Sequence, residues 1–198
     1  MAIIVDKVQK KRDITLSCKD LIVQNGIKNL TILKITSTAG ISKGSFYDYF
    51  KNKEEILFEL VNILMKKHNK IKEEKLLDVV LVKDKVKIFF DFFYREEDSE
   101  LREIYKDFIY ISLITPSDEI IEFQTQCANE YYFWMQDIIQ NGIDTNEIIP
   151  EVNNLFKGFF ATIEGLFLSS ITTSTIDNLE DEINLYIDTI FKLIEVKK

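Results

Sequence analysis

The sequence has little proline, glycine, cysteine and histidine, and each shortage excludes a class of protein. Two prolines and six glycines interrupt 198 residues, so few positions favour turns and long helices are expected. Cys18 and Cys127 lie far apart without a CxxC pair, and His68 is the single histidine. These numbers exclude a disulfide framework and a zinc-finger spacing. We expect both cysteines to be small packing residues and the protein to need no metal or cofactor.

Long apolar runs are also missing. The opening segment 2–5 is too short for the core of a signal peptide and has no cationic segment before it. No later stretch approaches the roughly 20 apolar residues that cross a bilayer. We therefore expect a cytoplasmic protein without membrane contact, whose 46% hydrophobic content supplies a buried core.

Catalytic motifs are a third absence. The chain has no GxSxG motif, no P-loop, no dinucleotide-binding glycine motif and no metal-ligand spacing. Its thirty-three carboxylates therefore resemble solvated helix faces rather than a catalytic pair. The sequence predicts a protein that is not an enzyme.

Charge is divided unevenly along the chain. Residues 1–53 hold ten Lys/Arg and four Asp/Glu, a net charge of +6, whereas residues 54–198 hold fifteen and twenty-nine, a net charge of −14. A basic N-terminal segment on an acidic body favours contact with nucleic acid at one end of the molecule. From charge alone, the alternative is an ordinary solvated helix face formed by Lys7, Lys10, Lys11 and Arg12.

The spacing of apolar and capping residues predicts an all-α fold that begins with a helix-turn-helix. Residues 13–24 have near-helical apolar spacing and end at Asn25-Gly26. Thr31 is a natural N-cap for a short second helix, and Ser42 caps a third over 43–49. Between them, Gly40 permits a left-handed turn. Two short helices joined by three or so residues cross steeply around one apolar contact.

The same segment resembles the TetR (tetracycline repressor) family of transcriptional regulators. The resemblance covers roughly residues 8–60 and includes Thr31, Ile35, the run Ala39-Gly40-Ile41-Ser42-Lys43-Gly44-Ser45-Phe46-Tyr47-Asp48-Tyr49-Phe50, Lys53 and Leu57. The chain departs from the usual family pattern at Cys18, Lys34 and Thr36, none of which removes a DNA-facing group. Taken alone, residues 47–50 could instead be an aromatic cluster that packs a small domain.

The resemblance implies that the third helix enters the major groove of a double-stranded DNA operator. Lys43 and Ser45 would contact bases, and Gly44 would keep the backbone close to DNA. Tyr47 and Tyr49 would reach phosphates, as would Thr31 and Lys53 at helix starts. With Ser42, the expected DNA-binding residues are Thr31, Ser42, Lys43, Gly44, Ser45, Tyr47, Tyr49 and Lys53.

Long amphipathic helices follow, which gives about nine helices in all. A connecting helix is expected over 54–75, followed by helices near 80–96, 99–113, 117–141, 150–170 and 176–197. We expect a DNA-binding domain over 1–53 and a ligand-binding and dimerisation domain over 76–198.

The last two helices carry broad apolar faces that are candidates for a homodimer interface, because helix-turn-helix proteins usually read two half-sites with two-fold symmetry. The alternative is that both faces are buried inside one subunit. The candidate interface residues are Phe156, Phe159, Phe160, Ile163, Phe167, Ile183, Tyr186, Ile187, Ile190, Phe191 and Ile194.

Aromatic residues are abundant in the C-terminal part, where they could line an apolar pocket. The candidate ligand-binding residues are Phe89, Phe92, Phe93, Phe108, Tyr110, Tyr131 and Trp134; the alternative is that they fill the core. By analogy with the family, we expect a repressor that leaves a palindromic operator when a hydrophobic small-molecule effector binds. The competing hypothesis is a DNA-binding protein whose C-terminal domain recruits a protein partner through an exposed apolar patch.

Overall fold

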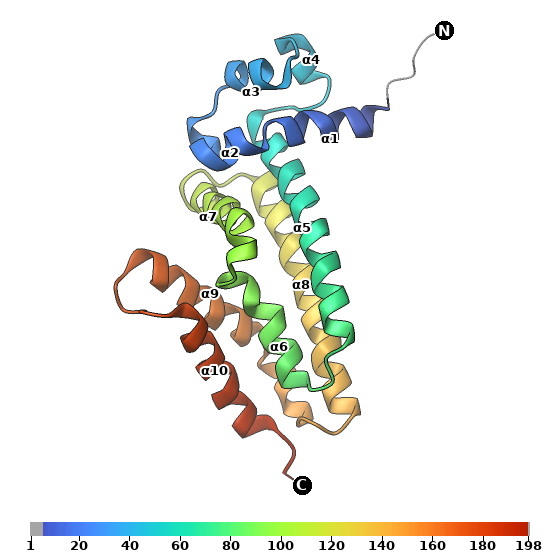
Figure 1. The fold of residues 1–198 in the computed structure, drawn as a ribbon, viewed down its shortest axis with the longest axis vertical. Helices are drawn as coiled ribbons and strands as arrows, with labels where there is room; N and C mark the ends of the chain where they lie inside the picture. The colour runs from blue at the N-terminus through green and yellow to red at the C-terminus, as the bar shows by residue number, and fades with distance from the viewer. Residues whose placement is uncertain (1–5, 198) are drawn as a thin grey trace. The chain divides into compact units, whose positions relative to one another are not determined.

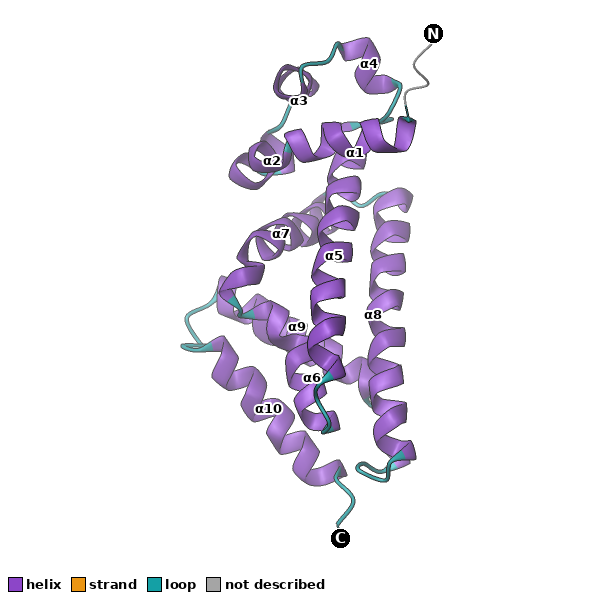
Figure 2. Ribbon diagram, turned by 45° about the vertical axis from the view of Figure 1, so that its right-hand side comes forward, coloured by secondary structure: helices purple, strands orange, loops and turns teal. Residues whose placement is uncertain are grey.

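A computed structural model describes residues 6–197, without the side chains of Ile27, Asn154 and Phe156. Every regular element in this range is a helix (Figure 2), and one isolated bridge joins Ile148 to Glu195. The prediction of an all-α fold is therefore confirmed. Among the same residues, no helix combines the length and the apolarity that crossing a membrane requires.

Ten α-helices form within the described residues (Figure 1): α1 (Lys7–Ser17), α2 (Lys19–Asn25), α3 (Ile32–Ala39), α4 (Lys43–Tyr47), α5 (Lys53–Leu77), α6 (Val82–Phe90), α7 (Ser99–Ile114), α8 (Asp118–Asp144), α9 (Phe156–Thr172) and α10 (Leu179–Ile194). Short 3₁₀ turns are η1 (Ile27–Asn29), η2 (Asp91–Phe93), η3 (Glu96–Asp98) and η4 (Pro150–Asn154). The predicted first helix is two helices, because the backbone changes direction at Cys18 (φ −97°, ψ 1°).

The chain divides into two compact units. The first unit comprises Met1–Asn69 with Glu100–Ile121, and the second unit comprises Lys70–Ser99 with Glu122–Lys198. Helices α5 and α8 contribute residues to both units. Each unit is described by itself below.

The first unit begins with a helix that starts earlier than its apolar pattern predicts. The Asp6 carboxylate caps α1 by accepting hydrogen bonds from the backbone amides of Val8 and Gln9, at 3.0 and 3.2 Å. The residues that follow are mostly cationic and exposed, so they lack the apolar spacing by which a buried helix is recognised. The core of this unit is formed by fully buried apolar side chains, among them Ile14, Cys18, Ile22, Ile35, Phe46, Phe50, Leu57 and Leu60.

Helix α7 belongs to the first unit and contacts the N-terminal helices. The ring of Phe108 packs on that of Phe58 of α5, with centroids 5.5 Å apart. The Lys28 ammonium donates a hydrogen bond to the Tyr110 hydroxyl at 2.7 Å. A salt bridge of 2.8 Å joins Lys19 to Glu100. These contacts hold the segment before α3 against α7.

The second unit is built around α6, α9 and α10. Its buried residues include Val82, Val86 and Phe90 of α6, Ile163 of α9, and Ile183, Ile187 and Phe191 of α10. Salt bridges from Lys87 to Asp188 (2.8 Å) and from Lys83 to Glu195 (3.6 Å) join α6 to α10. Gly142 of α8 lies so close to α6 that an added Cβ would meet Val82 Cγ2 at 2.6 Å. Only glycine fits this contact.

Candidate functional site

The helix-turn-helix is formed by α3 and α4, and local hydrogen bonds fix both of its helix starts. The Thr31 hydroxyl accepts from the Lys34 amide at 3.2 Å, and the Ser42 hydroxyl accepts from the Ser45 amide at 3.0 Å. Between the helices, Gly40 has the left-handed conformation (φ 64°, ψ 35°). The predicted caps and the predicted glycine turn are confirmed.

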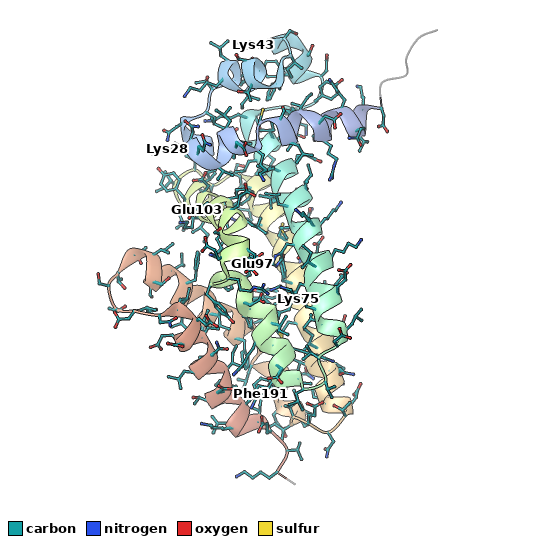
Figure 3. All side chains as sticks on the ribbon, viewed as in Figure 1. Lys28, Lys43, Lys75, Glu97, Glu103 and Phe191 are labelled. Atoms are coloured by element: carbon teal, nitrogen blue, oxygen red, sulfur yellow. The ribbon has the colours of Figure 1, made fainter. Side chains whose placement is uncertain are left out.

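The outer side of α4 is accessible. Lys43 and Gly44 are exposed, and Tyr47 has half of its surface accessible. Figure 3 shows Lys43 at the start of α4, with α3 beside it. The inner side of α4 is anchored by Phe46, which is fully buried and stacks on Phe50 with centroids 5.2 Å apart. The helix thus presents polar side chains outward from an apolar support.

Gly44 has no packing role within the described chain. A Cβ built on it would meet only the Ser42 hydroxyl oxygen, at the ordinary contact distance of 3.7 Å. Its backbone is helical, so no positive φ requires glycine there. A glycine that the fold does not need, on an exposed helix start, favours close approach of the backbone to another molecule.

The remaining predicted DNA-binding residues differ in exposure. Thr31 and Ser42 are exposed, whereas Ser45, Tyr49 and Lys53 are half-buried. The Ser42 and Ser45 hydroxyl oxygens lie 3.0 Å apart, so part of their hydrogen-bonding capacity is already used within α4.

Lys53 has a second task that the sequence did not reveal. Its ammonium donates to the carbonyl oxygens of Lys28 and Leu30, both at 3.2 Å. These bonds tie the start of α5 to the segment immediately before α3. Lys53 is thus a positioning residue of the helix-turn-helix, and its phosphate contact stays a prediction.

Asn52 is a capping residue that sequence reasoning missed. Its side-chain oxygen accepts from the Glu55 amide at 2.9 Å, and the Glu55 carboxylate accepts from the Lys51 amide at 2.5 Å. The pattern Asn-x-x-Glu was a signal for this arrangement, because it resembles a capping box. The cap fixes where α5 begins, directly after the loop that follows α4.

The predicted ligand-binding residues separate into groups. Phe89, Tyr131 and Trp134 come together in the second unit, where Phe89 lies 5.9 Å from Tyr131 and 5.3 Å from Trp134 between ring centroids. Phe160, which the sequence analysis assigned to the dimer interface, joins this group 5.7 Å from Phe89, and Tyr132, which is absent from the predicted ligand-binding residues, lies 4.7 Å from Phe160 between ring centroids. We call these five residues the ring cluster.

The other four predicted ligand residues make different contacts. Phe92 packs on Phe93 (5.3 Å), and Phe93 packs on Phe167 (5.2 Å) in the second unit. Phe108 and Tyr110 belong to the first unit, where they contact Phe58 and Lys28 as described above. The ring cluster is therefore the part of the predicted site that the structure assembles.

The candidate dimer residues require a correction, because most of them are buried within the single chain. Tyr186 and Ile190 are half-buried, and Phe156 lies outside the described side chains. The other eight are at most 7% exposed: Phe159, Phe160, Ile163, Phe167, Ile183, Ile187, Phe191 and Ile194. A side chain without accessible surface has no area to bury against a second copy. These eight residues form the core of the second unit, as the alternative interpretation held.

The sides of α9 and α10 that face away from these buried residues are exposed to solvent. The exposed side of α9 carries the small residues Gly158, Ala161 and Thr162, together with Leu168. On α10, Leu185 and Leu193 are 61% and 73% exposed. Any contact of these helices with a partner would involve this outward face.

Comparison with known proteins shows a similarity of the N-terminal segment to one family. Residues 18–60 match the model for bacterial regulatory proteins of the tetR family. The chain is 34% identical over 67 residues to the fatty acid metabolism regulator protein of Bacillus subtilis (strain 168), a match that spans 34% of each protein. The matched family segment contains α3, the glycine turn and α4.

Solved structures share the fold over nearly the whole chain. A protein of Saccharomonospora viridis in complex with choline has a TM-score of 0.77 at 16% identity, with 96% of this chain and 100% of that chain covered. The transcriptional regulator FadR of Bacillus subtilis, in complex with stearoyl-CoA, has a TM-score of 0.69 at 22% identity, with coverages of 91% and 95%. At these identities the likeness shows the fold alone. The similarity to the tetR family of bacterial regulatory proteins is thus found over residues 18–60, and the fold shared with these solved structures extends over nearly the whole chain.

Proposed function

We propose that this protein is a DNA-binding transcriptional repressor that leaves a palindromic operator when a small molecule binds its second unit. The observation that carries the proposal is the exposed start of α4, where Lys43 and Gly44 lie on a capped helix directly after the left-handed turn at Gly40. The basic charge of residues 1–53 supports it, because a net charge of +6 attracts the phosphate backbone.

The proposed mechanism begins with α4 in the major groove. Lys43 and Ser45 contact base edges, and Gly44 lets the backbone approach. Tyr47 and Tyr49 contact phosphates, as do Thr31 and Lys53 where α3 and α5 begin. The bonds from the Lys53 ammonium to the carbonyls of Lys28 and Leu30 keep α3 in register with α5.

Two copies of the chain bind two half-sites of the operator in this proposal. The interface uses the outward face of α9 and α10 in place of the buried residues predicted from the sequence. Small residues at 158, 161 and 162 allow close approach of two helices, and Leu168, Leu185 and Leu193 supply apolar area.

Effector binding takes place at the ring cluster of the second unit. The cluster combines large apolar rings with the hydroxyls of Tyr131 and Tyr132, which suits an apolar ligand with one polar group. The ligands of the two structural relatives, choline and stearoyl-CoA, support a small-molecule effector.

Selection from a random double-stranded DNA library tests the proposal. The full chain should enrich a palindrome, bind it in the nanomolar range at physiological salt and lose affinity steeply as salt rises. A panel of hydrophobic small molecules should contain compounds that lower this affinity. Failure to enrich any sequence would contradict the DNA-binding function.

One observation favours a second function, recruitment of a protein partner. The turn between α5 and α6 exposes Leu77, Val80 and Leu81, which are 83%, 80% and 52% accessible. An exposed apolar segment of this kind is typical of a docking surface. Under this alternative, Leu77→Ser with Val80→Ser would abolish repression in cells while leaving DNA affinity and its response to small molecules unchanged.

A further inference from the structure

Leu33 of α3 is a large apolar side chain that lies open on the helix-turn-helix. It is 78% exposed, whereas Ile35 and Thr36 on the inner side of the same helix are 0% and 4% exposed. Two residues turn an α-helix by about 200°, so Leu33 points away from the side on which Ile35 is buried. Leu33 therefore takes no part in the core of the first unit.

The outer sides of α3 and α4 belong to one surface. Figures 1 and 2 show both helices together on one side of α1 and α2. Ile35 of α3 and Phe46 of α4 are fully buried, and the Cys18 thiol, where α1 meets α2, donates to the Ile35 carbonyl at 3.6 Å. The sides of α3 and α4 opposite these buried residues therefore face away from α1 and α2. Leu33 lies on this surface with Lys43.

This surface comes from a part of the chain without acidic residues. Residues 21–47 contain three lysines and no Asp or Glu, although an even distribution of the chain's 33 acids would place several there. The Lys28 ammonium donates to the Tyr110 hydroxyl, whereas Lys34 on α3 and Lys43 on α4 are exposed. Both helices therefore favour a polyanion, and α3 should lie against DNA when α4 enters the groove.

The backbone around Leu33 is fixed by side-chain hydrogen bonds. The Lys34 amide donates to the Thr31 hydroxyl at 3.2 Å, and the Thr36 hydroxyl donates to the Leu33 carbonyl at 3.1 Å. A side chain on such a backbone loses little conformational freedom when it makes a contact. One turn further along α3, Ser37 is polar and exposed. Leu33 is thus a rigidly placed apolar group in a polar surface.

The major groove of DNA offers a group that matches this side chain. Base edges there present hydrogen-bond donors and acceptors, and thymine alone adds a methyl group. We propose that Leu33 packs against the C5-methyl group of a thymine in each half-site, which makes α3 a second base-reading helix beside α4. This inference rests on the proposed DNA-binding function and adds one residue and one base to it. The contact removes apolar area from water on both partners.

Removal of a single methyl group from the DNA tests the contact. In the operator selected from the random library, each thymine of one half-site, on either strand, is replaced in turn by deoxyuridine. This base keeps the hydrogen-bonding groups of thymine and lacks its methyl group. Fluorescence anisotropy should show that the full chain loses about fourfold in affinity at one such position, as expected for one buried methyl group. A half-site without thymine, or a scan in which no replacement changes the affinity, would overturn the inference.

Variants of Leu33 connect the methyl group to the side chain. Leu33→Ala should bind the operator more weakly than wild type and should bind it equally well with and without the methyl group at that position. Leu33→Gln, which keeps the helix propensity, should behave in the same way, whereas Leu33→Met should still prefer thymine. Leu113→Ala, at a leucine of α7 that is 75% exposed, is the matched control and should respond as wild type does. A fourfold loss on methyl removal that persists in Leu33→Ala would contradict the contact.

Random DNA separates base reading from an effect on folding. Leu33 carries no charge, so Leu33→Ala should leave the affinity for random DNA and the salt slope unchanged. Its melting temperature should also stay close to that of wild type, because the side chain is exposed. An equal loss of affinity on operator and random DNA would identify a structural effect and overturn the inference.

The outcomes also distinguish this inference from the function on which it rests. If the library yields no palindrome, the DNA-binding function and the role of Leu33 fail together. If it yields a palindrome whose recognition does not depend on a thymine methyl group, the repressor function stands and only the role of Leu33 fails.

Discussion

The ammonium of Lys72 lies 2.6 Å from a carboxylate oxygen of Asp91, and both side chains are almost fully buried. The same ammonium donates to the carbonyl oxygens of Ile88 and Phe89, both at 2.8 Å, where α6 ends. Arg95 donates to the second oxygen of Asp91 at 3.0 Å. Burial lowers the pKa of Lys72, and the charge of Asp91 acts in the opposite direction. The lysine therefore caps α6 from within the core.

Removal of this ammonium should destabilise the second unit. Lys72→Met keeps the apolar length but leaves two helix-end carbonyls and much of the Asp91 charge without their partner, which should lower the free energy of unfolding by about 3 kcal/mol. Urea unfolding followed by circular dichroism measures the change. Lys75→Met, at an exposed position on the same helix, is the control and should stay within about 0.5 kcal/mol of wild type. A loss below about 1 kcal/mol in Lys72→Met would contradict the capping role.

Gly44 and Gly40 should respond differently to alanine. Gly44→Ala adds a methyl group that the fold accommodates, so thermal stability should be unchanged or slightly higher, but DNA affinity should fall at least tenfold because the backbone cannot approach the groove as closely. Gly40→Ala should lower the free energy of unfolding by about 1 kcal/mol, since its backbone is left-handed. Thermal melts and DNA titrations of the two variants, side by side, provide the measurement. Unaltered DNA binding in Gly44→Ala would count against a groove-facing position.

Local features of this fold could be predicted from the sequence. Thr31, Gly40 and Ser42 act through the backbone within a few residues of themselves, so their residue types alone indicate the caps and the turn. The start of α1 was missed, although Asp6 is a good cap, because the residues after it lack apolar spacing. The division of the first helix at Cys18 has no comparable signal.

Long-range contacts could not be predicted in the same way. Nothing in the sequence pairs Lys53 with the carbonyl of Leu30, or Lys72 with Asp91, since each pair joins different elements of a folded unit. The apolar faces of α9 and α10 were identified, but a pattern of buried residues does not say whether a core or a second copy buries them. Phe160 shows this limit, because it was assigned to an interface and lies in the ring cluster.

The outward face of α10 should control the oligomeric state. Leu193→Glu together with Leu185→Glu places charge on exposed positions, so each chain should remain folded while two chains no longer associate. Sedimentation velocity should show a dimer for wild type and a monomer for the variant. Lys192→Glu, at an exposed neighbouring position on α10, tests whether added negative charge alone is enough to prevent dimerisation. If the variant with both Leu185→Glu and Leu193→Glu still sediments as a dimer, the outward face of α10 is not the dimer interface.

Lys53 should affect binding to every DNA sequence alike. Lys53→Met removes the bonds to the carbonyls of Lys28 and Leu30 and the proposed phosphate contact. Affinity should fall for operator and random DNA by the same factor, and the slope of log affinity against log salt should decrease by about 0.9. Lys66→Met, an exposed lysine further along α5, should leave both quantities unchanged. A slope equal to that of wild type would leave Lys53 with its positioning role only.

The most direct test of DNA recognition by α4 is the base preference of Lys43→Ala. Fluorescence anisotropy is measured for wild type and variant on the selected operator and on a set with single base-pair changes in one half-site. The account predicts that Lys43→Ala loses about 1–3 kcal/mol on the operator and becomes insensitive to substitution at one base pair, with other positions still discriminated. An equal loss on every sequence, with the full base preference retained, would contradict the claim that the start of α4 reads the operator.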